Sequence, residues 1–548
     1  MSTRRAAGAV SLTAAVLLVA GCGGADQGSA GGDTAARLDL VQTTAKATGG
    51  VDRINWLLEK EPDSFDLDLQ ASNQARTVMA NVCERLFQLG PDLVGAPHLA
   101  EKAAWTDDRT LVLTLRHDVT FHDGSPMTAD DVVYSLKRHS ADGAEESDKF
   151  ANVKSIDKTG EFEVTVKLGA PDALFLKSLA GDAGIVLNRS VIDNQGEDYG
   201  TPGHTDACSG PFVLKNWQSG TSVTIERAAN YWDKANSALS QTVVFRWATD
   251  STLVNSFTAG EADGSYVTSS TGPVVALQKQ KGVDVYFGPS SRAWSLIPTD
   301  RGPMKNKNIR KALALSLDRQ GVAKSGFSGV VQPWASPVGS GAWGYEKERF
   351  EAAQKELEPA APASPSEEDL TKAKELVKKA GAAADETIRV VSDGTQGRSV
   401  IANAVRAAGQ SIGLKVDITT VPPARFQEYY SDKKVRSTID IIADDWYIST
   451  ADPLGFYDNA LSGSSDNWVG FSDPQYDAQV TKALGTRDDA ARADLAIEVQ
   501  KRFLDNMVWI PLVQVPSTLI LSDRLTGAPA SGIAPYSPWA AKLGKKGQ

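Results

Sequence analysis

Apolar residues recur along this chain with two spacings, and each spacing predicts one kind of element. Residues 109–121 and 161–168 place apolar side chains at every second position, which is typical of a half-buried strand. Residues 128–139 and 490–506 space them three or four apart, which indicates an amphipathic helix. The same helical spacing predicts one continuous helix over residues 74–89.

The second half of the chain alternates strands and helices in a regular order. A strand is expected at 387–392, a helix at 399–413 and a second strand at 415–421. Another buried strand, 437–446, ends at Trp446. Units of this kind form parallel sheets that are covered by helices, whereas the first half reads as α+β. The expected fold class is therefore α/β.

The first residues have the features of an export signal. Arg4 and Arg5 precede an apolar run over 6–20. This run is too short to cross a bilayer comfortably, since a spanning helix needs about 20 apolar residues. A basic start followed by a short apolar core and small residues predicts a signal peptide over 1–21.

A single cysteine follows that apolar run. Residues 19–22, Val-Ala-Gly-Cys, resemble the bacterial lipobox, in which the cysteine is acylated and becomes the mature N-terminus. Acyl chains on Cys22 would hold the protein at a membrane surface, because each buried methylene adds about 0.8 kcal/mol of affinity. The Gly-rich stretch 22–50 is expected to be a flexible linker.

Length, charge and cysteine number narrow the class of protein. The chain has 548 residues and a net charge of −11, which argues against a nucleic-acid partner because such proteins carry a basic stripe. Besides Cys22 it contains Cys83 and Cys208, whose spacing matches no zinc pattern. Outside the cytoplasm these two cysteines could form a disulfide, and the alternative is two separate buried thiols.

No catalytic motif stands out. The sequence contains no HExxH, GxSxG or Walker A pattern. Its one GxGxxG match, 339–344, lacks the preceding strand of a dinucleotide site and is interpreted as a loop. His122 and Asp123 are interpreted as turn residues, and neighbouring Asp444 and Asp445 would point to opposite faces of a strand. An enzyme is not expected, and neither a cofactor nor a metal ion is expected.

Four stretches occur in an order that resembles a known family. They are "EPDSFDLDL" (61–69), "WTDDRTLVLTLRHDVTFHDGSPMTADDVVYSLKR" (105–138), "CSGPFVLKNWQSGTSVTIERAANYWD" (208–233) and "KNIRKALALSLDR" (307–319). They look like the landmarks of family 5 extracytoplasmic solute-binding proteins, the oligopeptide, dipeptide and nickel-type binding components of ABC importers. The resemblance covers roughly residues 51–529.

The resemblance implies a two-lobe, type II periplasmic-binding-protein-like fold with a hinge and an extra α+β domain inserted in lobe one. Lobe one would comprise residues 51–88, 199–288 and 516–548, the last with the tail. The inserted domain would be 89–198 and lobe two 289–515.

The same resemblance implies where the solute binds. The family's ligand-contacting segment begins with a tryptophan, here Trp446, and continues through Tyr447. Peptide-binding members resemble each other in placing an aspartate three residues after that tryptophan, where it pairs with the ligand's α-ammonium. Here this position is Ser449, which carries no charge. Asp445 and Asp452 are the candidates to replace it, and the alternative is a ligand without a free amino terminus.

These expectations together predict a binding protein that works with a membrane permease. We expect a monomer, lipid-anchored to the outer face of the cell membrane, that captures peptides or peptide-like solutes by hinge closure. Alternatives are a binder of an opine, a glycoside or a metal chelate, a lipid-anchored sensor, and a secreted hydrolase with an unrecognised site.

Overall fold

The computed structural model describes residues 38–69, 72–268, 271–446, 448 and 450–547. Several sequence predictions fall outside these residues, namely the signal peptide, the acylation site Cys22, the first part of the linker, Tyr447 and Ser449.

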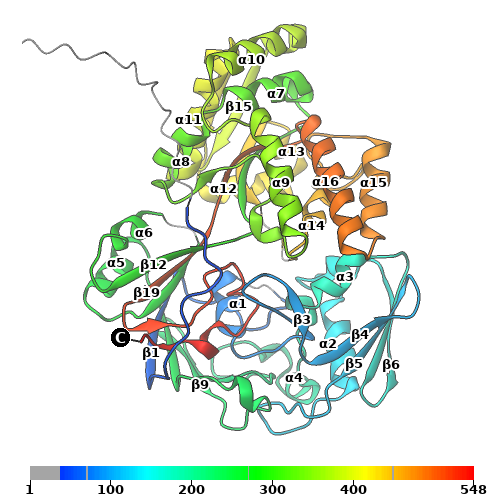
Figure 1. The fold of residues 1–548 in the computed structure, drawn as a ribbon, viewed down its shortest axis with the longest axis vertical. Coiled ribbons are helices and arrows are strands. Elements are labelled where there is room, and N and C mark those ends of the chain that lie inside the picture. The colour runs from blue at the N-terminus through cyan, green and yellow to red at the C-terminus, as the bar shows by residue number, and fades with distance from the viewer. Residues whose placement is uncertain (1–37, 70–71, 269–270, 447, 449, 548) are drawn as a thin grey trace, which may run out of the picture. The chain divides into compact units, whose positions relative to one another are not determined.

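The sheet of lobe one gathers strands from both ends of the chain (Figure 1). Its strand order is β12-β19-β11-β1-β10-β9-β8, and β1 runs parallel to β10 and β11. The strands are β1 (Arg53–Leu58), β8 (Phe212–Gln218), β9 (Ser222–Arg227), β10 (Thr242–Trp247), β11 (Gly264–Val267), β12 (Val283–Gly288) and β19 (Ser517–Ser522). The helices are α1 (Asn73–Met79), α5 (Asp250–Thr258) and α6 (Gly272–Leu277), and the short strands β20 (Leu525–Thr526) and β21 (Gly544–Lys545) pair with each other. Lobe one is therefore completed only by the last part of the chain.

The sheet of lobe two has the order β14-β18-β13-β17-β15-β16, with β15 parallel to both β16 and β17. Its strands are β13 (Ala293–Pro298), β14 (Gln332–Pro333), β15 (Thr387–Ser392), β16 (Lys415–Thr420), β17 (Ile441–Trp446) and β18 (Ile510–Gln514). Its helices are α7 (Lys307–Ser316), α8 (Arg319–Phe327), α9 (Lys347–Leu357), α10 (Glu367–Ala380), α11 (Gln396–Ser411), α12 (Pro423–Ser431), α13 (Lys433–Arg436), α14 (Leu454–Tyr457), α15 (Pro474–Leu484) and α16 (Asp489–Asp505). The chain crosses between the two lobes at 288–293 and at 514–517, which we call the crossings.

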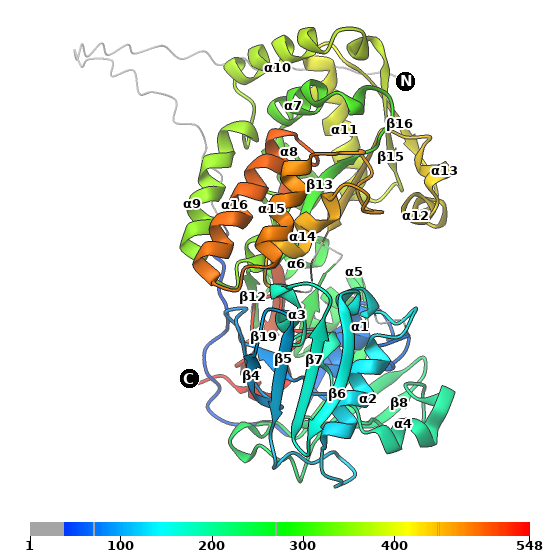
Figure 2. The same cartoon turned by 90° about the vertical axis from the view of Figure 1, so that its right-hand side faces the viewer.

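The inserted domain has an antiparallel sheet of its own (Figure 2). The order is β4-β5-β7-β6, and α2 packs beside β6. Its elements are β2 (Phe87–Leu89), β3 (Gly95–Pro97), β4 (Ala100–Trp105), β5 (Thr110–Leu115), β6 (Val153–Gly160), β7 (Glu163–Leu168), α2 (Ala129–His139), α3 (Ala173–Ser178) and α4 (Arg189–Gln195). Helix α2 begins with a capping box, in which the Asp131 carboxylate accepts a hydrogen bond from the Thr128 backbone N–H at 2.9 Å.

The predicted helix over 74–89 is wrong in its second half. Helix α1 ends at Met79, and the chain then turns and enters β2 at Phe87. Val82 and Leu86 are buried as their spacing suggested, but they pack from a turn rather than from a helix. The carbonyl of Val82 accepts a hydrogen bond from the N–H of Gly210 at 2.8 Å, so a distant segment replaces the helical partner.

The expected linker is shorter than the Gly-rich stretch. Leu40 and Thr43 form isolated bridges with Phe287 and Pro529, and the Thr44 N–H donates to the Ala528 carbonyl at 3.0 Å. Residues from about 40 onward are therefore packed on lobe one, because their backbone groups find partners there.

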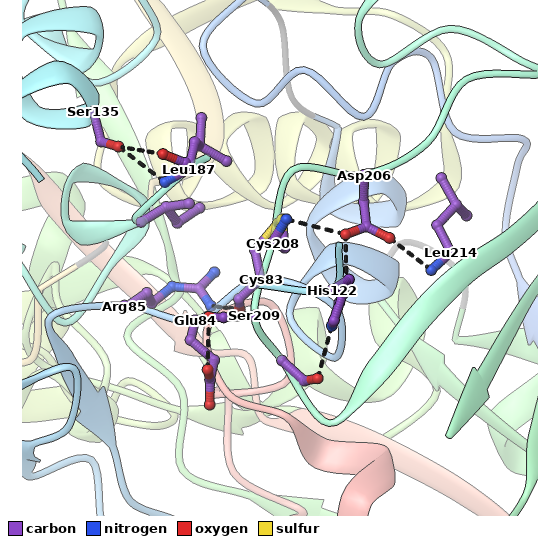
Figure 3. The surroundings of a disulfide bond; sticks show 12 residues. Cys83, Glu84, Arg85, His122, Ser135, Leu187, Asp206, Cys208, Ser209 and Leu214 are labelled. Carbon is purple, nitrogen blue, oxygen red and sulfur yellow. Dashed lines mark hydrogen bonds and ion pairs between the residues drawn. A yellow bond between two sulfur atoms is a disulfide. The ribbon is translucent and has the colours of Figure 1, made fainter. Parts of the chain in front are cut away.

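The junction between the inserted domain and lobe one, which we call the neck, is cross-linked (Figure 3). A disulfide joins Cys83, which precedes the inserted domain, to Cys208, which follows it, with a Cα–Cα distance of 4.7 Å. The adjacent Glu84 carboxylate accepts four hydrogen bonds of 2.6–2.8 Å, from His98, Ser209, Tyr231 and Trp232. His122 also lies at the neck. Its Nδ1 is 2.5 Å from the Asp206 carboxylate and its Nε2 is 2.9 Å from the Gly210 carbonyl, so both ring nitrogens are used in structural contacts.

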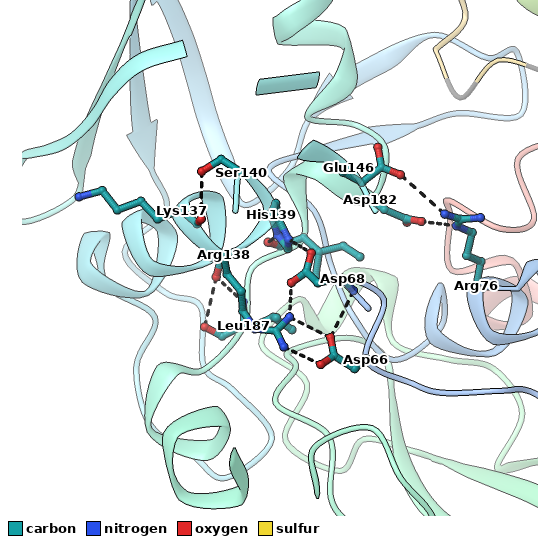
Figure 4. A network of polar contacts seen from close by, with 12 residues as sticks. Asp66, Asp68, Arg76, Lys137, Arg138, His139, Ser140, Glu146, Asp182 and Leu187 are labelled. Carbon is teal, nitrogen blue, oxygen red and sulfur yellow. Dashed lines mark hydrogen bonds and ion pairs between the residues drawn. The ribbon is translucent and has the colours of Figure 1, made fainter. Parts of the chain in front are cut away.

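A second group of contacts at the neck joins two of the landmark stretches (Figure 4). Arg138 of α2 donates to Asp66 at 2.8 Å and also pairs with Asp68. His139 Nδ1 lies 2.6 Å from the other oxygen of Asp68. These pairs, the disulfide and Glu84 fix the inserted domain on lobe one.

Candidate ligand-binding site

The carboxyl end of β17 opens onto two cavities. β17 lies between β13 and β15 in the lobe two sheet, and ligands of α/β sheets bind beyond the carboxyl ends of strands. Both cavities are lined by Asp444, Asp445, Ile448, Thr450 and Tyr536. The segment that follows β17 is thus a common wall of both cavities.

The first of these, the central cavity, has a volume of about 320 Å³ and lies between lobes. Lobe one contributes the end of β11, including Tyr266 and Thr268, and the start of β19 at Ser517. Lobe two contributes the crossing residues Ser291 and Arg292. A solute in this cavity would touch both lobes and both crossings.

The second, the acidic cavity, has a volume of about 460 Å³. Its ionisable lining residues are Arg76, Glu145, Glu146, Asp148, Lys149, Asp444, Asp445, Asp458 and Asp466. Burial, with a smaller effect of the Asp182 charge, raises the pKa of Glu146 to about 7, and burial raises the pKa of Asp458 to about 6. Carboxylates outnumber cations here, so this cavity favours a cationic group.

A third cavity, of about 390 Å³, lies between the inserted domain and lobe two. Lys177, Tyr345, Arg487 and Arg492 line it. Thr450 lines this cavity as well as the other two. The three cavities therefore meet at the segment after β17.

Asp444 and Asp445 point to different partners, as neighbours on a strand should. Asp445 accepts a hydrogen bond from Arg292 Nε at 2.9 Å, and Arg292 Nη1 donates to the Thr268 carbonyl of lobe one at 2.9 Å. Asp444 accepts from Arg398 Nη2 at 2.7 Å, and burial together with the Asp445 charge raises its pKa. Asp445 is thus at the predicted site, but its charge is already balanced by Arg292.

Trp446 is half-buried at the edge of the acidic cavity. Its ring meets Trp509 nearly edge-on, with ring centroids 5.4 Å apart. The indole therefore has one side in the lobe two core while the residue also lines the cavity.

Asp452 has a different place from the one expected. Its side chain is fully buried (0% exposed) and it pairs with Arg492 Nε at 3.0 Å and Lys177 Nζ at 3.1 Å. The hydroxyl of Tyr345 donates to its other oxygen at 3.2 Å. Since these partners use its charge, Asp452 links lobe two to the inserted domain and is not exposed to a ligand.

Sequence reasoning missed most of the acidic cavity. Arg76 lies on α1, whereas Glu146 and Lys149 belong to the inserted domain and Asp458 follows α14. Figure 4 shows Arg76 with Asp182 and Glu146, at 2.7 Å and 3.7 Å. Only the folded chain brings these residues together, and no local pattern marks them.

Comparison with known proteins identifies the family. Residues 96–468 match the family described as bacterial extracellular solute-binding proteins, family 5 Middle. The chain belongs to this family. It is therefore a solute-binding protein of extracellular type rather than an enzyme, and its fold is the type II fold of that family.

Relatives and solved structures span nearly the whole chain. The dipeptide-binding protein DppE of Bacillus subtilis is 26% identical over 497 residues, covering 86% of this chain and 88% of its own. The ABC transporter substrate-binding protein CtaP of Listeria monocytogenes has a TM-score of 0.77 at 20% identity and covers 91% of this chain and 99% of its own. DppA of Helicobacter pylori, in complex with the peptide STSA, has a TM-score of 0.71 at 20% identity, with coverages of 92% and 99%.

The described residues lack the features of a metal site and of a membrane-spanning helix. Among these residues, no group of three or more His, Cys, Asp or Glu side chains could hold a metal ion. None of the helices described is long and apolar enough to span a membrane.

Proposed function

We propose that this protein captures a peptide or peptide-like solute between its lobes and delivers it to the permease of an ABC importer. The observation that carries the proposal is the segment after β17, which lines all three cavities between the lobes and the inserted domain. The peptide-binding names of its relatives support a peptide as the solute.

Backbone recognition suits this segment. An extended peptide can pair with an extended protein segment through main-chain hydrogen bonds, whatever its side chains are. Each such bond contributes about 1 kcal/mol net. Trp446, with residues 448 and 450 at the cavity wall, belongs to the segment that would accept the peptide in this way.

The ammonium group of a peptide ligand needs a carboxylate that is not already in an ion pair within the protein. Asp445 pairs with Arg292, and Asp452 pairs with Arg492 and Lys177. Asp458 lines the acidic cavity, and the groups that favour its charged form are the Lys149 ammonium and the Asn459 backbone N–H; within the described ranges no cation lies within 4.0 Å of its carboxylate. We propose that Asp458 supplies the counter-charge; Glu146 lines the same cavity.

Asp445 and Asp452 are each paired with basic residues of the protein, and this also supports a second class of solute. A solute without a free amino terminus, such as an opine, a glycoside, a modified peptide or a metal chelate, would need no counter-charge from either residue. Native mass spectrometry of the purified protein would detect a co-purified solute of either class.

Calorimetry with an alanine tetrapeptide and its N-acetylated form separates these candidates. We expect the free peptide to bind more tightly, and Asp458→Asn to weaken it about tenfold, equivalent to about 1.4 kcal/mol, without affecting the acetylated form. Asp417→Asn, at an exposed position of β16, is the control and should leave both affinities unchanged. Equal affinity of the wild type for the two peptides would favour the solute without an ammonium group.

The anchor is a separate part of the proposal. We propose that Cys22 is acylated, so that the packed residues from about 40 onward are joined to the membrane by a short linker. Metabolic labelling with an alkyne-bearing palmitate analogue should mark the wild type and not Cys22→Ser. Uptake of the bound solute should fail when the permease is deleted, whereas a sensor would still signal.

A further inference from the structure

The third cavity, between the inserted domain and lobe two, has more positive than negative charge around it. Lys177 of α3 lines it together with Arg487 and Arg492 of lobe two. Of the described residues that line it, Asp489 alone is acidic. Asp452, which is fully buried and does not line the cavity, balances one further charge. The cavity therefore favours an anionic group, in contrast to the acidic cavity.

The Lys177 ammonium is only partly neutralised by the protein. Its Nζ lies 3.1 Å from Asp452, but the same carboxylate also pairs with Arg492 at 3.0 Å. Burial lowers the pKa of Lys177, and the Arg492 charge adds to this effect, whereas Asp452 opposes it. A carboxylate brought beside Lys177 would therefore stabilise its charged form.

Arg487 has N–H donors that the protein does not use. Its Nη2 donates to the Asp108 carboxylate at 2.7 Å and to the Asp107 carbonyl at 3.1 Å. Within the described part of the chain, neither Nε nor Nη1 makes a hydrogen bond. The side chain of Asp108 is 85% exposed, so water screens this ion pair. The guanidinium lies 4.8 Å from the centroid of Trp105, which also lines the cavity, and it can still bind a carboxylate there.

The rest of the lining is mainly apolar. The inserted domain contributes Phe87, Leu89, Leu93, Val94, Pro97, Ala173, Leu176 and Ala180. The volume of about 390 Å³ leaves room for an amino-acid side chain. A carboxylate on an apolar stem fits this lining, because the stem can lie on the apolar residues while the charge reaches the cations.

The third cavity opens beside the path expected for the peptide backbone. It shares Leu89, Leu93, Thr450 and Ala451 with the central cavity. A terminal carboxylate is attached directly to the backbone, so it could reach the cations only if the backbone left the segment after β17. A glutamate side chain carries its carboxylate on two methylenes and can enter the cavity while the backbone stays on that segment.

We propose that the third cavity is a specificity subsite for an acidic side chain of the bound peptide, whose carboxylate binds Lys177 and Arg487. The assignment rests on the proposed function, because it needs a peptide held at the segment after β17. It adds a preference that main-chain pairing alone does not give. Since Lys177 belongs to the inserted domain and Arg487 to lobe two, the carboxylate would also join these two parts.

Calorimetry with alanine tetrapeptides tests the subsite, with Glu or Gln placed at each position after the first. At one of these positions Glu should bind about tenfold more tightly than Gln. Arg487→Gln and Lys177→Gln should each remove most of this preference and leave the affinity for the Gln peptide within about twofold. Arg502→Gln is the matched control and should keep the preference. The Arg502 side chain is 31% exposed against 33% for Arg487, pairs with Asp473 at 2.6 Å and lines none of the three cavities.

The results separate the subsite from the proposed function. If none of the tetrapeptides binds, the proposed function fails and the subsite with it. If alanine tetrapeptide binds but Glu and Gln are equivalent at every position, only the subsite is overturned. A preference for Glu that persists in both variants also overturns it. Asp452 keeps Arg492 when Lys177 is changed, and Arg487→Gln alone decides the matter if Lys177→Gln fails to fold.

Amidated peptides distinguish the two sources of a carboxylate. Alanine tetrapeptide and its C-terminal amide should respond equally to Arg487→Gln, because the side-chain subsite is empty in both. If amidation weakens binding about tenfold and Arg487→Gln abolishes this difference, the terminal carboxylate occupies the third cavity and the side-chain assignment is wrong.

Discussion

The neck and the crossings are two junctions in one molecule, and they are built differently. At the neck, a disulfide, a carboxylate with four donors and the Arg138 pairs hold the inserted domain on lobe one. At the crossings, two stretches of backbone join the lobes, and cavities lie beside both of them. The polar contacts between lobes there include Arg292 with the Thr268 carbonyl.

The construction of the two junctions indicates where the molecule can move. A cross-linked, buried junction resists relative motion, whereas backbone crossings flanked by cavities can absorb a hinge change. Three of the four landmark stretches meet at the neck, through Asp68, His122, Arg138 and Ser209. The residues that carry the resemblance to the family therefore mainly hold the inserted domain on lobe one.

Of the changes considered, removing the disulfide should lower the free energy of unfolding most. The loop that it closes spans 125 residues, so the variant with both Cys83→Ala and Cys208→Ala should lose about 4–5 kcal/mol of unfolding free energy. Chemical denaturation measures this loss. Solute affinity should stay within about twofold, because the neck is not the binding site, and a large loss of affinity by a still-folded variant would contradict the comparison.

Glu84→Gln should cause the second-largest loss of unfolding free energy. The amide keeps one acceptor but sets an NH₂ group against donors, so we expect a loss of about 3 kcal/mol. Glu145→Gln is a milder carboxylate change, since Glu145 is more exposed. Equal stability of the two variants would show that the neck does not depend on Glu84.

Local signals in the sequence predicted much of this frame. The helix predicted over 128–139 is α2, and the strand predicted over 437–446 ends at Trp446 as β17 does. The helix over 74–89 failed because a partner from Gly210 replaced its hydrogen bonds. The pairing of Asp452 could not be predicted from the sequence, because its partner Lys177 is distant along the chain.

A smaller effect should follow from pH at the acidic cavity. The pKa of Glu146 is raised from 4.5 to about 7, so the folded state binds its proton more tightly than the unfolded state does. Stability from this group is present below about pH 4.5 and is lost as pH rises towards 7. Chemical denaturation at several pH values should show that the free energy of unfolding falls between pH 4.5 and 7. Glu146→Gln should reduce this fall, and an identical fall in both proteins would contradict the prediction.

Breaking the contacts between the inserted domain and lobe two should have the smallest effect on stability. Lys177 pairs with Asp452 at 3.1 Å, and Arg487 pairs with Asp108 at 2.7 Å. The double variant Lys177→Met, Arg487→Met should lose only about 1 kcal/mol, because Asp452 keeps Arg492. Amide hydrogen exchange should nevertheless become faster at the crossings, 288–293 and 514–517. Faster exchange at the neck instead would show that the neck, and not the crossings, is the mobile junction.

Small-angle X-ray scattering with and without saturating solute measures whether the lobes close on a solute by bending at the crossings. The protein and its disulfide-free variant should both show a smaller radius of gyration with solute, since the movement lies at the crossings and not at the neck. An unchanged radius, with binding verified by calorimetry in the same sample, would contradict the account.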